Sequence, residues 1–252
     1  EHQTINAYGN NFKKTTLGYD FILFHEMGHE WWGNYLSVLD WSDFWIHEGI
    51  DTYAEAIYVE EKFGNEALKN FVKNRFKKNI TNKYPVIPPK NSTAENIAGN
   101  DVYYKAAYGL HMIRYLVGKE VLWNTLKEFL HMPKDFVNNQ TNTKEFISLI
   151  NENSGQDLNW FFEQYFYKES LPTLYIKNRI VKDKNFMDMW WAEEKFKMPV
   201  DVQYESFDGI RVKKMNINNK KKTMVMPKES SFIIDPDAWL LFNLVKLDNL
   251  VE

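Results

Sequence analysis

The stretch HEMGHEWWGN (25–34) carries two histidines four residues apart, with a glutamate directly after the first. Positions four apart on an α-helix lie about 6 Å apart on one face, so His25 and His29 can aim both imidazoles at one point. Glu26 lies on a neighbouring part of that face, where it can contact a metal-bound water rather than the metal. This HExxH pattern indicates a zinc site, although an ordinary helix with two satisfied histidines is the alternative on these residues alone.

A third ligand is required, because a catalytic zinc site uses three protein ligands and keeps one position open. The segment WIHEGIDTYAE (45–55) supplies Glu48, nineteen residues after His29. That separation allows the first helix to end, a loop at 40–44 to follow, and a second helix to pack antiparallel to the first. Glu48 would then project from the first turn of the second helix toward the histidines, although a carboxylate there can also act as a cap.

The composition is that of a globular protein with a substantial core. The chain has 252 residues, of which 44% are hydrophobic and 16% aromatic, enough for one large domain or two modest ones. It has no cysteine, which excludes disulfides and cysteine-based zinc sites. The net charge of −3 gives no reason to expect nucleic acid as a partner. With no apolar run of about 20 residues and no signal peptide, we expect no membrane span in this chain, and the compartment stays open.

The hydrophobic pattern changes near residues 171–172. Apolar residues recur at helical spacing before this point, and the loop between 79 and 100 is rich in proline. The expected helices are 19–36, 46–63, 66–76, 102–117, 121–131, 144–153 and 158–167. Short alternating runs follow, separated by turn-forming residues, as is typical of antiparallel strands in a sandwich-like module. The expected strands are 174–181, 199–207, 209–217, 222–227 and 231–235. We therefore expect an α+β multidomain protein, with a mainly α-helical domain at 1–170 and a small β-sandwich domain at 171–252.

The HEMGHEWWGN stretch, followed by HEG at 47–49, resembles the pattern of the aminopeptidase N (membrane alanyl aminopeptidase) family of gluzincin zinc metallopeptidases. The resemblance implies that the helical domain is thermolysin-like and binds one Zn²⁺ per chain. It assigns His25, His29 and Glu48 as the metal ligands and Glu26 as the general base. The family often has asparagine before the third ligand, where this chain has His47, which could act as a competing ligand.

Two further stretches resemble motifs of the same family. In DVYYKAAYGL (101–110), the family's Tyr-x-Lys-Gly pattern assigns Tyr103 as the residue that stabilises the oxyanion, with Ala106 in place of glycine. The opening EHQTINAYGN (1–10) resembles the end of the family's Gly-x-Met-Glu-Asn motif, which assigns Glu1 to the substrate's α-ammonium group. A tyrosine in the core is the alternative for Tyr103, and an incidental first residue is the alternative for Glu1.

The resemblance implies a zinc-dependent aminopeptidase that hydrolyses the N-terminal bond of peptides with a free N-terminus. A zinc-activated water would attack, and Glu26 would act as the general base. Glu55, two turns after Glu48, is a candidate to accept the second N–H of a histidine ligand. The alternatives are a thermolysin-like endopeptidase and a catalytically silent peptide-binding homologue. The chain matches a middle slice of a typical member, so we expect the missing N-terminal domain of a longer protein as its partner.

Overall fold

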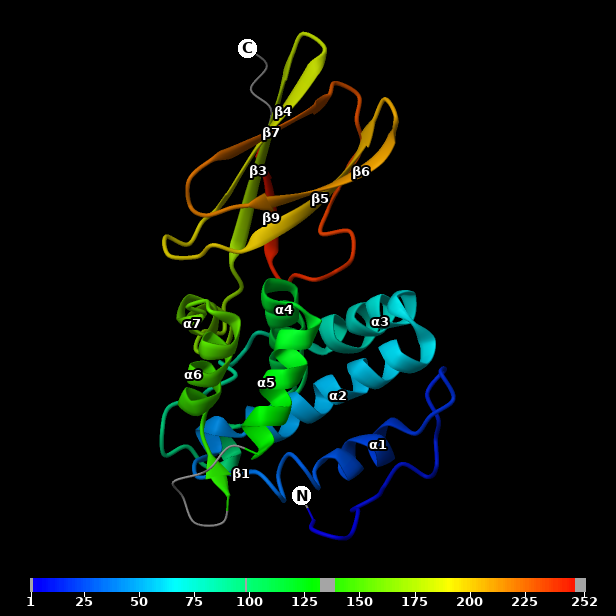
Figure 1. The fold of residues 1–252 in the computed structure, drawn as a ribbon, viewed down its shortest axis with the longest axis vertical. Coiled ribbons are helices and arrows are strands. Elements are labelled where there is room, and N and C mark those ends of the chain that lie inside the picture. Colours follow the sequence, from blue (N-terminus) through cyan, green and yellow to red (C-terminus); the bar gives the residue numbers. More distant parts are fainter. Residues whose placement is uncertain (1, 98, 132–138, 248–252) are drawn as a thin grey trace. The chain divides into compact units, whose positions relative to one another are not determined.

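The computed structural model describes residues 2–97, 99–131 and 139–247 and contains both helices and sheets (Figure 1). The expectation of a mixed helical and sheet protein is therefore confirmed. The chain divides into two compact units, Glu1–Glu169 and Ser170–Glu252. Within the described residues, no helix combines the length and apolar character needed to cross a membrane.

Helices make up most of the first unit. They are α1 (Phe21–Gly28), α2 (Trp45–Phe63), α3 (Asn65–Phe71), α4 (Tyr104–Val117), α5 (Lys119–His131), α6 (Thr143–Ser154) and α7 (Asn159–Tyr165). Short 3-10 turns lie at Trp41–Asp43, Lys77–Asn79 and Ala94–Asn96, and a π-helical turn at Val72–Phe76 continues α3. The strands β1 (Ser37–Val38) and β2 (Gln140–Thr141) form a short parallel pair.

The helix that carries the HExxH motif is shorter than the predicted 19–36, and that prediction is wrong in its extent. The helix α1 ends at Gly28, and His29 is its C-cap. The backbone N–H groups of the next turn then donate to carbonyls five residues back, from Asn34, Tyr35 and Leu36 to His29, Glu30 and Trp31. Gly33 has a φ of 141°, which a side chain disfavours, so regular helix stops here although apolar residues continue at helical spacing.

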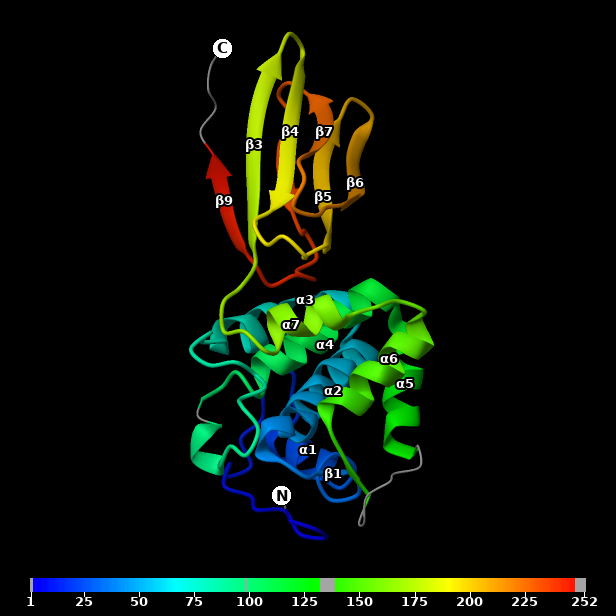
Figure 2. The ribbon, with the colours of Figure 1, turned by 90° about the vertical axis from the view of Figure 1, so that its left-hand side faces the viewer.

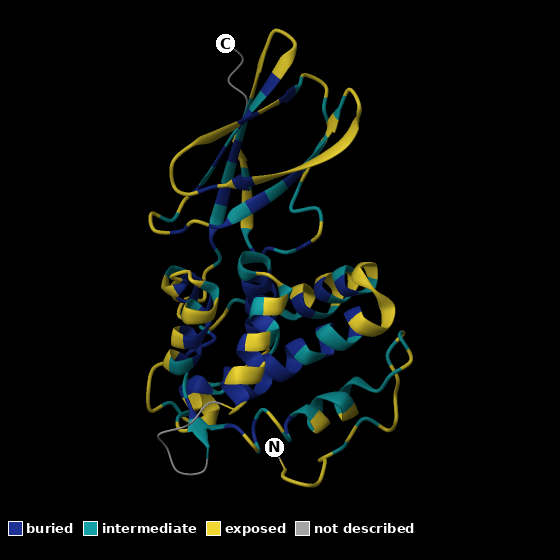
Figure 3. Ribbon diagram, viewed as in Figure 1, coloured by how far each residue is buried: buried dark blue, intermediate teal, exposed yellow. Residues whose placement is uncertain are grey.

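The helix α2 is buried along most of its length (Figure 3) and contacts α1, α3 and α4. It matches the predicted helix 46–63 closely, and Gly64 follows its last residue. Four of its buried side chains are acidic, namely Glu48, Asp51, Glu55 and Glu60. Buried carboxylates are costly unless they are paired, so their presence on a core helix marks α2 as the element that carries the polar site.

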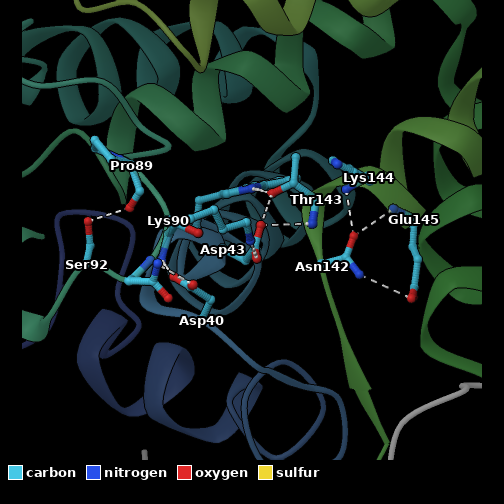
Figure 4. Close-up of polar contacts among 12 residues, drawn as sticks. Asp40, Asp43, Pro89, Lys90, Ser92, Asn142, Thr143, Lys144 and Glu145 are labelled. Atoms are coloured by element: carbon cyan, nitrogen blue, oxygen red, sulfur yellow. Dashed lines mark hydrogen bonds and ion pairs between the residues drawn. The ribbon is translucent and has the colours of Figure 1, made fainter.

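The start of α2 is held by a network of polar contacts around Asp43 (Figure 4). One Asp43 oxygen accepts from the backbone N–H of Thr143 at 3.0 Å and from its hydroxyl at 2.6 Å, and Lys90 lies 2.6 Å from the other. The indole N–H of Trp45 donates to the same hydroxyl at 2.8 Å. These contacts tie the first turn of α2 to the start of α6, and so fix the turn from which Glu48 projects.

The helices α2 and α4 approach each other closely at Gly49 and Ala106. A Cβ placed on Gly49 would lie 2.4 Å from the Cβ of Ala106, a separation that no pair of real side chains tolerates. Ala106 stands where the family pattern has glycine, and its extra methyl group fits because the residue facing it, Gly49, has no side chain. Farther along, Arg114 of α4 donates to Glu60 of α2 at 2.8 and 2.5 Å, a buried ion pair that joins the same helices.

The second unit contains two sheets (Figure 2). The first has the order β7 (Lys222–Pro227), β4 (Lys184–Trp191), β3 (Thr173–Val181) and β9 (Asn243–Leu247); the second has the order β6 (Gly209–Asn216), β5 (Pro199–Ser206) and β8 (Phe232–Ile234). Alternate side chains of β4 and β5 are buried, including Met187, Met189, Val200 and Val202. In this unit the sequence did not predict β4 and β9, and β9 pairs with β3 in parallel.

Candidate metal centre

His25, His29 and Glu48 lie together, and one ligand atom from each is within 4.8 Å of the others. The Nε2 atoms of His25 and His29 lie 3.0 and 3.5 Å from the same oxygen, Oε2, of Glu48. Their rings are 4.7 Å apart between centroids although His29 lies just beyond the end of α1. Two imidazole nitrogens and one carboxylate converging on a point form the donor set of a catalytic zinc site, so these residues fit that metal.

The electrostatics of the cluster couple its histidines to its carboxylates. Burial by itself raises the pKa of Glu48, but the contacts with His25 and His29 outweigh it and lower that pKa to about 2. Burial likewise lowers the pKa of His25, but Glu48, Glu55 and Asp51 outweigh it and raise that pKa to about 10. Glu48 is therefore ionised as a ligand must be, whereas His25 has to release a proton to bind a metal.

The second ring nitrogen of each histidine also faces an acceptor. Nδ1 of His29 lies 3.0 Å from the carbonyl oxygen of Trp32, in the irregular turn that follows α1. Nδ1 of His25 lies 3.5 Å from Asp51 and 3.6 Å from Glu55, both on α2. Metal-bound histidines usually donate this N–H to a carbonyl or carboxylate, which fixes the ring orientation. The surroundings of both rings therefore suit ligands that bind through Nε2.

A cavity of about 390 Å³ opens beside the cluster. Glu26 lines it together with His25, His29 and Glu48, so the HExxH glutamate faces the same space as the three candidate ligands. Such a position allows a carboxylate to exchange a proton with a molecule held in the cavity.

Tyr103 also lines the cavity. It is the N-cap residue of α4 and directly precedes that helix. Its hydroxyl donates to Oε1 of Glu48 at 3.0 Å, and its ring lies 6.1 Å from that of His25. The structure thus brings a phenolic donor from residue 103 to the cluster formed by residues 25–48. A hydroxyl at this place can donate to charge that develops in the cavity.

Two other predicted residues lie apart from this cluster or outside the described chain. Glu1 lies outside the described residues, and its neighbour His2 lines the cavity. The cluster found among the described residues does not include His47, whose ring packs 5.1 Å from that of Phe44.

Sequence reasoning missed two residues near the cluster. Arg75 lines the cavity from the π-helical turn and lies 4.0 Å above the ring of Phe21. Asp51 faces His25, and its only trace in the sequence is its position three residues after Glu48 on the same helix face. The sequence pattern around Arg75 gives no sign that this turn packs against α1.

The family model and the similar curated proteins all indicate the same family of peptidases. The model of the Peptidase family M1 domain matches residues 10–165. Among curated relatives, this chain is 24% identical to Aminopeptidase N of Lactococcus lactis subsp. lactis over 166 residues, covering 61% of this chain and 19% of that protein. It is 22% identical to the Puromycin-sensitive aminopeptidase of Caenorhabditis elegans over 239 residues, covering 88% of this chain and 25% of that protein.

The fold is similar to that of a solved structure, Legionella pneumophila aminopeptidase A in complex with aspartic acid. The TM-score is 0.71 at 17% identity, and the match covers 89% of this chain and 26% of that one. The chain thus spans about a quarter or less of the length of these similar proteins.

Proposed function

The chain belongs to peptidase family M1, whose domain model matches more than half of its residues, and we propose that it supplies the metal-binding and catalytic part of a zinc aminopeptidase. The observation that carries this proposal is the convergence of His25, His29 and Glu48 beside a cavity that Glu26 and Tyr103 also line. The aminopeptidase names of the similar proteins support the reaction class.

The side chains divide the chemistry between them. Bound zinc would supply a Lewis acid that lowers the pKa of a water in its open position and polarises the scissile carbonyl. Glu26 would accept the proton of that water and pass it to the leaving amine. Tyr103 would donate a hydrogen bond to the developing oxyanion, and losing such a donor typically costs ~10²–10³ in rate.

Restriction to the first peptide bond requires a group that binds the substrate's free α-ammonium. We assign this role to Glu1 on its resemblance to the family motif. A carboxylate that must pair with a free N-terminus lets only the first peptide bond reach the metal. The substrates would then be peptides with a free N-terminus.

The two units would correspond to two domains of a longer enzyme. We propose that residues 1–170 are the remaining part of a thermolysin-like catalytic domain and that residues 171–252 are a β-sandwich domain. A further N-terminal domain of the longer protein would complete the substrate site. An endopeptidase and a catalytically silent peptide-binding homologue remain the alternatives.

The test compares two peptides that differ only at the N-terminus. The protein, with zinc added, is incubated with an aminoacyl reporter peptide and with its N-acetylated form, each with and without a chelator. We expect chelator-sensitive release of the first residue from the free peptide and no cleavage of the acetylated one. Internal cleavage of both peptides at similar rates would instead favour the endopeptidase, and zinc binding without any cleavage would favour the silent homologue.

A further inference from the structure

Asp51 is a buried carboxylate that takes no direct part in the proposed reaction. It lies one turn after Glu48 on α2, and its exposed fraction is 0%. Within the described part of the chain, neither of its carboxylate oxygens has a hydrogen-bond partner. A buried polar group without a partner costs folding free energy, so a partner is expected in the working state of the protein.

The ring nitrogens near Asp51 show which partner it faces. Its Oδ2 lies 3.5 Å from Nδ1 of His25 and 3.8 Å from Nδ1 of His29. Nδ1 of His29 already has the carbonyl of Trp32 at 3.0 Å, which leaves His25 as the ring for Asp51. The other nitrogen of His25 points to Glu48 at 3.0 Å, so a metal bound there would leave the proton on the nitrogen that faces Asp51.

Gly28 makes room for this carboxylate. A Cβ placed on Gly28 would lie 1.6 Å from Oδ1 of Asp51 and 2.5 Å from its Cγ. Even the methyl group of alanine would therefore displace the Asp51 carboxylate or separate α1 from α2. The second x position of HExxH, directly before His29, is thus matched to Asp51 on the other helix.

We propose that Asp51 is a positioning residue that accepts the Nδ1–H of His25 and orients this ring for zinc, and that Gly28 is required to admit its carboxylate. The inference rests on the proposed zinc site and goes beyond it, because it assigns the orientation of one ligand to a pair of residues on two helices. Glu55 faces the same nitrogen at 3.6 Å and is the rival for this role.

Zinc affinity of the demetallated full chain, measured by competition with a chromophoric chelator, tests the assignment. We expect Asp51→Ala to weaken zinc binding about 10–100-fold, as is typical when a ligand loses its orienting partner. Asp51→Asn keeps an acceptor oxygen and should lose less. Glu61→Gln, an exposed carboxylate on the same helix, is the control and should bind zinc like the parent chain.

The double variant tests the pairing with Gly28. Gly28→Ala should weaken zinc binding by itself, because its methyl group takes the place of the Asp51 carboxylate. In Gly28→Ala/Asp51→Ala the carboxylate is absent, so the loss should not exceed that of Asp51→Ala alone. If the double variant instead loses zinc affinity by the sum of the two single losses in free energy, Gly28 and Asp51 act independently and the pairing is contradicted.

The thermal midpoint of the metal-free variants separates positioning from a merely structural role. Since Asp51 has no hydrogen-bond partner among the described residues, Asp51→Asn should not lower the metal-free midpoint although it weakens zinc binding. A lowered midpoint with unchanged zinc affinity would overturn the proposal, and so would loss of affinity in Glu55→Gln but not in the Asp51 variants. If the parent chain itself fails to bind zinc, the proposed function fails first.

Discussion

At the scale of single residues, Glu48 is the side chain on which the cluster converges. One of its oxygens faces both histidines, and the other accepts from the hydroxyl of Tyr103. The histidines and Tyr103 come from two different segments of the chain, and the helix that carries Glu48 lies between these segments in the sequence. Glu26 differs from these residues because it lines the cavity without belonging to the ligand cluster.

That difference gives a prediction for Glu26→Gln. The amide keeps the shape of the side chain but cannot accept a proton, so we expect zinc binding to be retained and peptide hydrolysis to fall by about 10²–10⁴-fold, the usual contribution of a general base. Zinc content and turnover of an aminoacyl reporter are measured on the same sample.

The matched control is Glu30→Gln, four residues farther along the chain and outside the cavity lining. This variant should keep both zinc and activity. Full activity in Glu26→Gln would refute the role of Glu26 and leave the metal site itself untouched.

At the scale of the helices, the contact between Gly49 and Ala106 sets the approach of α2 and α4 next to the site. Gly49 follows Glu48 directly, and Ala106 lies three residues after Tyr103. The chain has no room for a second methyl group at this contact, because a Cβ on Gly49 would lie 2.4 Å from that of Ala106. The small residues here therefore determine how closely the hydroxyl of Tyr103 can approach Glu48.

We expect Gly49→Ala to separate the two helices and to destabilise the protein by about 1–3 kcal/mol, the usual cost of overpacking a core. The free energy of unfolding is measured by urea denaturation, followed by the helical signal in circular dichroism. Gly49→Ala/Ala106→Gly moves the methyl group to the other helix and should recover most of the loss. If the double variant is no more stable than Gly49→Ala, the contact does not limit the approach of the helices.

At the scale of the whole molecule, all three candidate ligands belong to the unit Glu1–Glu169. A metal that binds only the folded form stabilises it by about 2.7 kcal/mol when free zinc is at 100 times its dissociation constant. We therefore expect chelation to lower the stability of the helical unit in particular.

Hydrogen exchange measured on peptides with and without a chelator tests this expectation. Peptides from α1, α2 and the start of α4 should lose protection when zinc is removed, whereas peptides from β3 to β7 should not. Equal loss of protection in both units would mean that the metal acts on the whole chain rather than on the helical unit.

Much of this arrangement could be predicted from the sequence because it depends on local spacing. The proximity of the His25 and His29 rings follows from their separation by four residues, and it survives although α1 ends before His29. The family resemblance drawn from these motifs is confirmed by the match over residues 10–165. The extent of α1 was predicted wrongly because apolar periodicity continues past Gly33, whose backbone conformation only the structure reveals.

The sequence by itself determined the HExxH pair, the third carboxylate on the next helix and the change from helices to strands near residue 171. Only the tertiary structure decided that the hydroxyl of Tyr103 reaches Glu48 and that the Asp51 carboxylate occupies the space left by Gly28. The physical reason is that helical periodicity fixes which side chains share a face of one helix. The approach of two helices depends on the size of the residues where they touch, and those residues lie far apart in the chain.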